Sequence, residues 1–290
     1  MNDKMGLSLI AEVMGWDSEA EATGEYAWLR LMSSVKYDSY SYFRAGVRFI
    51  ETLATWLKQF DIADRPAAYS FVKERLVYLS LPEVQCLVDN FIPEVVTPRL
   101  REIVAEELGV KPYEVWSDAN GSAAFNRRLR KVLFIGLSDG SRIDLLRRNN
   151  VSRISQEQVV PMMNIDLEKW RDLNKNLVEH PGMNAGEKFD EVFLVDDFTA
   201  SGTTFIRKID GVWKGKLRKF NDLVVQARDA LNDDFPIAEN YALHIHHYIS
   251  SFQAKKASRS ASRKRTSTGR RSHSAHTRFP KASSFRRSCR

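Results

Sequence analysis

Two short, uninterrupted apolar runs constrain this fold more than any other feature of the sequence. The first is VLFIGL, residues 132–137, and the second is VFLV, residues 192–195. Such runs are typical of strands covered on both faces, as in parallel sheets. Helical patterns at residues 143–148, 166–178 and 216–231 alternate with them, and residues 241–249 form a third expected strand. The chain is therefore predicted to be an α/β protein with a parallel sheet.

The N-terminal part shows apolar residues at helical spacing instead. Ile50, Ala54 and Leu57 recur at steps of three and four, and residues 61–66 interrupt the pattern before further helical stripes follow. A later helix is expected to end at Gly109, because glycine readily adopts the left-handed conformation of a helix C-cap. The sequence thus divides into a helical N-terminal region, residues 1–110, a sheet-containing core, residues 111–254, and a tail, residues 255–290.

The basic character of the chain is confined to this tail. The whole chain has a net charge of +7, but residues 255–290 contain 13 lysines and arginines and no acidic residue, which leaves 31 basic and 37 acidic residues in the rest. The tail has almost no aliphatic side chains, so it is predicted to be disordered. It suggests nucleic-acid binding only weakly. An equally good explanation of the abrupt change in composition is a frameshift or another non-native end.

Membrane insertion and secretion are not expected from the sequence. The apolar runs are far shorter than the roughly 20 residues that a membrane-spanning helix needs. The N-terminus lacks the basic start and apolar stretch of a secretory signal. The two cysteines do not form a CxxC pair, and a reducing, cytoplasmic location is expected.

The segment VFLVDDFTASGTT, residues 192–204, combines a buried strand with a loop suited to a sugar phosphate. Asp196 and Asp197 follow the strand at its carboxyl end, where open α/β sheets bind ligands. The small residues after them allow the backbone to approach an anion closely, and a glycine permits unusual dihedral angles. A helix is expected to begin near Gly202, so that its N–H groups would attract a phosphate. Two carboxylates beside a phosphate cradle suit the vicinal hydroxyls of a ribose phosphate.

The same run resembles the phosphoribosyl-diphosphate (PRPP) fingerprint of type I phosphoribosyltransferases, and all thirteen positions match it. The resemblance implies that Asp196 and Asp197 contact the ribose hydroxyls and are the catalytic residues. It implies PRPP binding by Asp196, Asp197 and the loop Thr199, Ala200, Ser201, Gly202 and Thr203, whose backbone amides would hold the 5′-phosphate. Mg²⁺ is the implied cofactor, carried by PRPP, with a water-mediated contact from Asp196 and no metal ligand assigned directly to the protein.

A second loop, SDGSR, lies where members of that fold place their pyrophosphate-binding loop. The resemblance therefore implies pyrophosphate binding by Ser138, Asp139, Gly140, Ser141 and Arg142. Because Asp-Gly is a common turn pair, a plain turn is the alternative. Residues 180–188, rich in turn formers, are the candidate for a mobile loop that closes over the ligand.

Over residues 56–253 the chain is similar to a bacterial phosphoribosyltransferase-like family associated with conflict and defence systems. This implies a phosphoribosyltransferase-like core whose N-terminal helices form a hood or a surface for a protein partner. The expected function is binding of PRPP or a related ribose phosphate, with pentosyl transfer and release of pyrophosphate if the protein is an enzyme of nucleotide metabolism. The alternative is a non-catalytic PRPP or nucleotide sensor, or a defence effector that acts through a partner protein.

Other phosphate-binding motifs fit less well. A receiver domain places its acidic pair near its start, whereas about 190 residues precede the pair here. A haloacid dehalogenase needs DxD, and a Walker loop needs GK[ST] after its glycine, where this chain has Thr203 after Gly202. The PRPP interpretation is therefore favoured over these three.

Two further groups of residues are interpreted as structural. On a strand, His244 and His246 share one face and His247 takes the other, without the acidic or cysteine spacing of a metal site. They are predicted to be half-buried strand histidines. The cations at residues 127–131 could steer a polyphosphate, but a solvated helix end explains them better.

Overall fold

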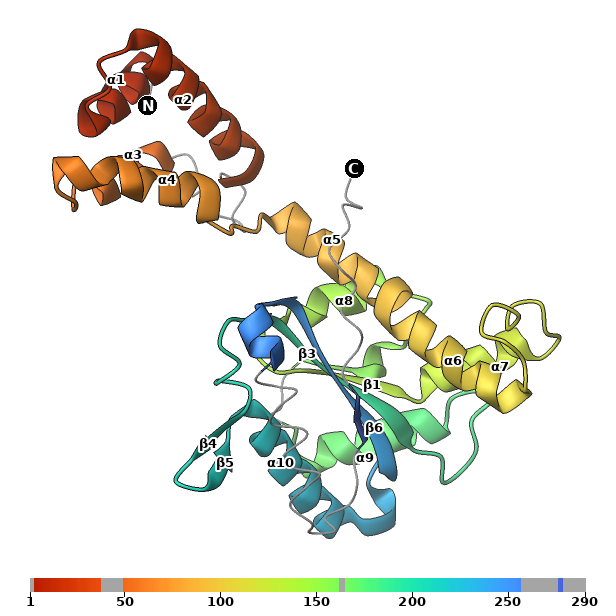
Figure 1. The fold of residues 1–290 in the computed structure, drawn as a ribbon. Helices are drawn as coiled ribbons and strands as arrows, with labels where there is room; N and C mark the ends of the chain where they lie inside the picture. Colours follow the sequence, from red (N-terminus) through yellow and green to blue (C-terminus); the bar gives the residue numbers. More distant parts are fainter. Residues whose placement is uncertain (1–2, 38–48, 162–164, 257–275, 279–290) are drawn as a thin grey trace. The chain divides into compact units, whose positions relative to one another are not determined.

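The computed structural model describes residues 3–37, 49–161, 165–256 and 276–278. It separates into two compact units, Met1–Cys86 and Leu87–Arg290. Among the described residues, the first unit contains helices without strands, and the second contains helices together with the parallel sheet (Figure 1). The last helix of the predicted N-terminal region belongs to the sheet-containing unit by this division.

The N-terminal unit is a group of helices around its own small core. Its helices are α1 (Asp3–Met14), α2 (Glu19–Met32), α3 (Phe49–Leu57) and α4 (Arg65–Arg75), and α5 (Leu81–Phe91) crosses into the second unit. The predicted stripe Ile50, Ala54 and Leu57 is buried there, packed with side chains of α1 and α2. The expected interruption is a short 3-10 turn, Ile62–Asp64, after which α4 begins with a proline in its first turn.

The second unit opens with helical turns that lead into the sheet. A π-helical turn, Ile92–Val96, joins α5 to α6 (Thr97–Leu108), and Gly109 ends α6 in the left-handed conformation with φ +69°, as predicted. Helix α7 (Gly121–Arg130) then precedes the first strand. No helix in the described ranges is both long enough and apolar enough to cross a membrane.

The sheet confirms the predicted parallel α/β architecture. Its strand order is β2-β1-β3-β6-β7, and every neighbouring pair is parallel. The bounds are β1 (Val132–Gly136), β2 (Val159–Val160), β3 (Phe189–Thr199), β6 (Ile237–Ser250) and β7 (His276–Arg278). All five residues of β1 are buried, which explains its uninterrupted apolar sequence. Parallel pairing brings the carboxyl ends of the strands to one edge of the sheet.

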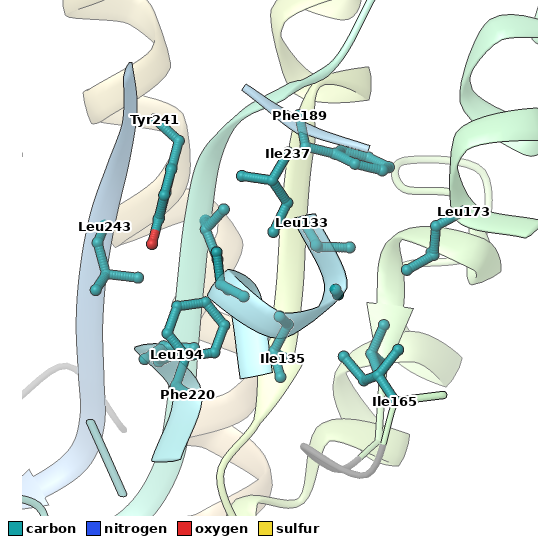
Figure 2. Close-up of a cluster of buried hydrophobic side chains, with 14 of the residues drawn as sticks. Leu133, Ile135, Ile165, Leu173, Phe189, Leu194, Phe220, Ile237, Tyr241 and Leu243 are labelled. Atoms are coloured by element: carbon teal, nitrogen blue, oxygen red, sulfur yellow. The ribbon is translucent and has the colours of Figure 1, made fainter. Parts of the chain in front are cut away.

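Helices α9 (Leu167–Val178) and α10 (Lys216–Leu231) cover one face of this sheet. Leu133, Ile135 and Leu194 pack against Leu173 of α9 and Phe220 of α10 in a buried hydrophobic cluster (Figure 2). Both helices lie where the sequence predicted them, with Asp166 as the N-cap of α9. On the connection after β1, α8 (Ile143–Asn149) forms the expected short helix.

Aromatic side chains cover the opposite face. Phe193 of β3 stacks on His244 with ring centroids 4.4 Å apart, and Phe91 lies 4.3 Å from the ring of His246. His247 points to the other face and meets Phe205 edge-on. His244 also contacts the buried carboxylate of Glu191. The three histidines therefore lie on β6 in the predicted alternation. His246 and His247 are half-buried as predicted, whereas His244 is fully buried.

The tail contributes one described strand, and its first two residues, 255–256, end a helical segment that begins at Phe252. Strand β7 pairs in parallel with residues 242–244 of β6 and extends the sheet by one strand. Composition alone had predicted disorder for residues 255–290. The remainder, residues 257–275 and 279–290, lies outside the described residues, so that prediction stays a prediction there.

We expect His246→Phe to reduce the acid sensitivity of the fold. Burial, with a smaller contribution from His247, lowers the pKa of His246 from its usual 6.5 to about 3. Between these two values the unfolded chain binds a proton at this position that the folded chain does not. The free energy of unfolding therefore falls as the pH decreases through this window, by at most about 1.4 kcal/mol per pH unit from this residue. Phenylalanine keeps a ring against Phe91 but does not titrate.

Urea denaturation of both proteins at pH 7 and pH 5 measures this effect. The loss of stability between the two pH values should be smaller in the variant. An equal loss in both proteins would contradict the role given to His246.

Candidate functional site

The acidic pair lies at the carboxyl end of β3, and its two members face opposite sides of the sheet. Strand β3 continues through the pair to Thr199, beyond the end expected from the sequence. Successive side chains of a strand point to opposite faces. Asp196 accordingly lies on the α10 side and is buried, whereas Asp197 is exposed. The two carboxylates are therefore not equivalent.

Asp196 is held by two partners from other elements. One carboxylate oxygen accepts a hydrogen bond from the Oγ of Ser138, in the loop after β1. The other lies 2.5 Å from Nζ of Lys216, the first residue of α10. A buried carboxylate needs such partners, because an unpaired charge away from water is costly. Asp196 thus joins β1, β3 and α10 at one point.

Asp197 lies against the SDGSR loop. It accepts the N–H of Phe198 at 2.7 Å, and a Cβ added at Gly140 would collide with its carboxylate. A larger residue at this position would have to push the Asp197 carboxylate away from the loop. The structure therefore brings the predicted pyrophosphate loop and the acidic pair together, although more than fifty residues separate them in sequence.

The SDGSR loop itself is a tight turn. Asp139, Gly140 and Ser141 form a 3-10 turn, and Arg142 adopts the left-handed conformation with φ +51° at the start of α8. Ser141 is buried, Asp139 is exposed, and Arg142 is half-buried. Gly136, just upstream, also permits a close approach, because a Cβ there would collide with the carbonyl oxygen of Pro161.

The loop after the acidic pair differs from the prediction, because no helix begins at Gly202. Gly202 has φ +77°, and the chain turns there and continues into a hairpin of β4 (Arg207–Ile209) and β5 (Val212–Lys214). Helix α10 begins only at Lys216. The apolar residues of the hairpin, such as Ile209 and Val212, favour strands over helices. This favours the hairpin over the expected helix.

The predicted phosphate loop is nevertheless held in place by hydrogen bonds from the end of β6. The N–H of Ser251, after β6, donates to the carbonyl of Thr199 at 3.0 Å, and the Oγ of Ser251 donates to the carbonyl of Ala200. The hydroxyls of Ser201 and Thr203 lie 2.7 Å apart. Ala200 and Thr203 are exposed, and Gly202 is buried against Ala254.

The end of α10 that faces this loop is already occupied by protein groups. The N–H of Lys216 donates to the carbonyl of Thr204 at 3.2 Å, and that of Leu217 donates to the carbonyl of Phe205 at 3.1 Å. The first two donors of the helix thus bind the loop itself. A phosphate at residues 199–203 would depend on the loop amides and hydroxyls rather than on a free helix N-terminus.

Lys216 is a site residue that the sequence reasoning missed. Its ammonium group contacts Asp196 although twenty residues separate them, because the hairpin folds out and returns α10 to the end of β3. The sequence did predict a helix that begins at Lys216, which placed a cation at its first residue. Without the hairpin, nothing in the sequence connects this lysine to the acidic pair.

Tyr248 is a second residue near the acidic pair that the sequence did not reveal. It lies one position beyond His247, the register partner of Asp196, and therefore on the same face as Asp197. Its hydroxyl oxygen is buried and has no hydrogen-bond partner among the described residues. Burial, and then the charge of Asp144, raise the pKa of this hydroxyl, so it stays a neutral donor.

The predicted closing loop, residues 180–188, lies at the wrong edge of the sheet. It precedes Phe189, the first residue of β3, whereas Asp196 lies seven residues further along the strand, roughly 23 Å away. Arg127 holds this loop by donating to the carbonyl of Gly182 at 2.7 Å and contacting Glu187. The interpretation of residues 180–188 as a lid over the site is therefore wrong.

The cations of the same edge are neutralised there. A pocket lined by Arg127, Arg128 and Lys131 also contains Glu107 and Glu187. Arg128 and Lys131 both pair with Asp190, at 2.6 and 2.8 Å. These cations stabilise the amino edge of the sheet and are remote from the acidic pair.

A comparison with protein families agrees with this architecture. A model of the PRTase-CE family matches residues 53–287, which is more than half of the chain. The chain belongs to the PRTase-CE family. The match to this phosphoribosyltransferase-like family spans the whole parallel sheet, both loops and most of the basic tail. Searches of curated proteins and of solved structures gave no match.

We expect Lys216→Met to destabilise this PRTase-CE protein by about 1–3 kcal/mol, because it leaves a buried carboxylate without its cation. The side chain of Asp196 is 5% exposed. Chemical denaturation measures the change. Arg218→Ala is a matched control on the same helix, since its pair with Asp222 is exposed and should contribute less than about 1 kcal/mol.

The double variant Asp196→Asn with Lys216→Met should recover part of the lost stability, because it removes both charges. Additive losses in the double variant, or equal effects of the Lys216 and Arg218 substitutions, would contradict the coupling between Lys216 and Asp196.

Proposed function

We propose that this protein binds PRPP, or a closely related ribose phosphate, at the carboxyl edge of β1, β3 and β6. The observation that supports this most directly is the convergence of Ser138 and Gly140 on Asp196 and Asp197. Two loops that resemble the pyrophosphate and ribose-phosphate subsites meet at one edge. Membership of a phosphoribosyltransferase-like family supports the same assignment.

In this proposal the two acids have different tasks. Asp197 is exposed, and its carboxylate would accept hydrogen bonds from the ribose hydroxyls. Asp196, already bound by Ser138 and Lys216, would keep the pyrophosphate loop and α10 in place around the sugar. The backbone of residues 199–203 would hold the 5′-phosphate, with the hydroxyls of Ser201 and Thr203 as further donors.

The pyrophosphate group would lie on the SDGSR loop. Gly140 allows the backbone to approach closely, and Arg142 supplies a positive charge at the end of the turn. The buried hydroxyl of Tyr248 is a neutral donor on the Asp197 side. A charge-dense anion suits this combination of backbone amides, a hydroxyl and a guanidinium group.

The carboxylates fit Mg²⁺ only if PRPP supplies most of its ligands. Among the described residues no group of three or more metal-binding side chains is found. Asp196 is engaged with Lys216, which leaves the exposed Asp197 as the acid free to contact the ion or its water. Mg²⁺ commonly binds through one or two carboxylates together with substrate phosphates. When bound, it would neutralise the pyrophosphate leaving group.

Catalysis, if the bound PRPP reacts, would be displacement of pyrophosphate from the anomeric carbon by an acceptor nucleophile. Positive charge would develop on the sugar, and the site would act by holding the reacting groups in place. Asp197 lies free to accept a proton from the acceptor. Asp196 is less suited to this task, because both of its oxygens already have partners.

A non-catalytic sensor is the second candidate, because the pairing of Asp196 with Lys216 leaves Asp197 alone of the two acids to act as a base. An acid held by Lys216 strengthens a rigid binding site but contributes no free base. The two candidates are separated by turnover. Protein incubated with PRPP, Mg²⁺ and a panel of bases and nucleotides either releases pyrophosphate or only binds PRPP.

We expect Asp197→Asn to weaken PRPP binding by about tenfold or more, because charge-assisted hydrogen bonds to the ribose hydroxyls would be lost. Titration calorimetry with Mg²⁺ present measures the affinity. Asp229→Asn is a matched control, because Asp229 is an exposed acid on α10 outside the two loops. Unchanged affinity in the Asp197 variant would refute the site, as would an equal loss in the control.

A further inference from the structure

The hairpin that follows the candidate phosphate loop is an open, basic ribbon. Strands β4 and β5 pair antiparallel and are joined by Asp210 and Gly211, both with positive φ, as in the tight turns of two-residue hairpins. In Figure 1 the ribbon projects away from the parallel sheet. Two strands alone are marginally stable, so this element is suited to gain stability from a partner.

The side chains of this ribbon combine positive charge with an aromatic ring. Arg207, Lys208 and Lys214 are exposed, and Asp210 is the one acid of residues 207–214. Within the described part of the chain, none of these three cations takes part in an ion pair. Lys208 lies over the ring of Trp213, with its Nζ 5.7 Å from the ring centroid.

Both ends of the ribbon are fastened to the candidate site. At its start, the guanidinium of Arg207 donates to the carbonyl of Thr203 at 3.0 Å. At its end, Gly215 leads directly into Lys216, whose ammonium contacts Asp196. A molecule bound along the ribbon would therefore lie next to the proposed ribose-phosphate subsite.

We propose that the β4–β5 hairpin binds single-stranded nucleic acid. The cations are spread along an open ribbon rather than gathered in a pocket, which suits a chain of phosphates better than one nucleotide. Lys208 and Trp213 share one face of the ribbon, and Arg207 and Lys214 share the other. An unpaired base could stack on Trp213 beside Lys208, while the phosphates on either side of it contact the other cations. Cationic grooves with stacking aromatic residues bind single strands without sequence preference. An acidic peptide could pair with the cations, but it has no nucleobase to stack on the ring of Trp213.

The location of the nucleic acid next to a bound sugar phosphate rests on the proposed PRPP site. The binding of single-stranded nucleic acid by the hairpin does not. Fluorescence anisotropy of the full chain with labelled oligo-dT and oligo-U of about twelve nucleotides tests it, and the two arms distinguish DNA from RNA. Trp213→Ala should weaken binding by about fivefold or more through lost stacking. The basic tail is the same in every variant, so differences between variants report on the hairpin.

The salt dependence tests the charges separately. Lys208→Ala with Lys214→Ala should lower the slope of log affinity against log salt by about 1.4, because each lost phosphate contact removes about 0.7 on a single strand. The matched control is Lys111→Ala with Tyr113→Ala, which removes an exposed lysine and aromatic ring with a similar 5.6 Å contact. This control should bind both oligonucleotides as the unchanged protein does.

Equal affinities of the hairpin variants and the unchanged protein for both oligonucleotides would overturn the proposal, as would an equal loss in the Lys111 and Tyr113 control. Equal binding of a duplex, with no effect of Trp213→Ala, would also overturn it. The two proposals fail separately. If calorimetry detects no PRPP binding while oligonucleotide binding still depends on the hairpin, the PRPP site is refuted and the hairpin proposal stands.

Discussion

The buried carboxylate of Asp196 is the interaction on which the candidate site depends. It accepts from Ser138 in the loop after β1 and from Lys216 at the start of α10. Three segments that are distant in sequence therefore meet at one acid. Because a buried charge without partners is costly, the loop after β1 and the start of α10 are constrained to the positions that satisfy it. The exposed Asp197 is left free for a ligand.

The different environments of the two acids follow from strand geometry. Since β3 continues through both residues, their side chains point to opposite faces. One face is closed by α10, and the other is open beside Gly140. A motif of two adjacent acids thus produces one structural carboxylate and one available carboxylate. The resemblance to the phosphoribosyltransferase fingerprint gave both acids the same role, and the strand separates them.

Parallel pairing also places different sets of charged residues at the two ends of the strands. At the amino edge, Arg128 and Lys131 are neutralised by Asp190. At the carboxyl edge, the loop of residues 138–142 meets the acidic pair, and the basic hairpin begins close by. The loop of residues 180–188 was misassigned because turn-forming residues mark a loop but carry no information about the edge at which it lies.

The sequence by itself determined the three central strands of the sheet and most helices, since continuous apolar runs such as residues 132–136 and helical stripes such as that of α10 are local patterns. It also indicated the two candidate loops, residues 138–142 and 199–203, through their glycines and small residues, which allow a close approach of the backbone to an anion. Only the tertiary structure decided that Gly202 turns into a hairpin, that Lys216 returns to Asp196, and that β7 joins the sheet. These features depend on contacts between residues far apart in the chain, and no local pattern encodes which distant partner satisfies a buried charge or an open strand edge.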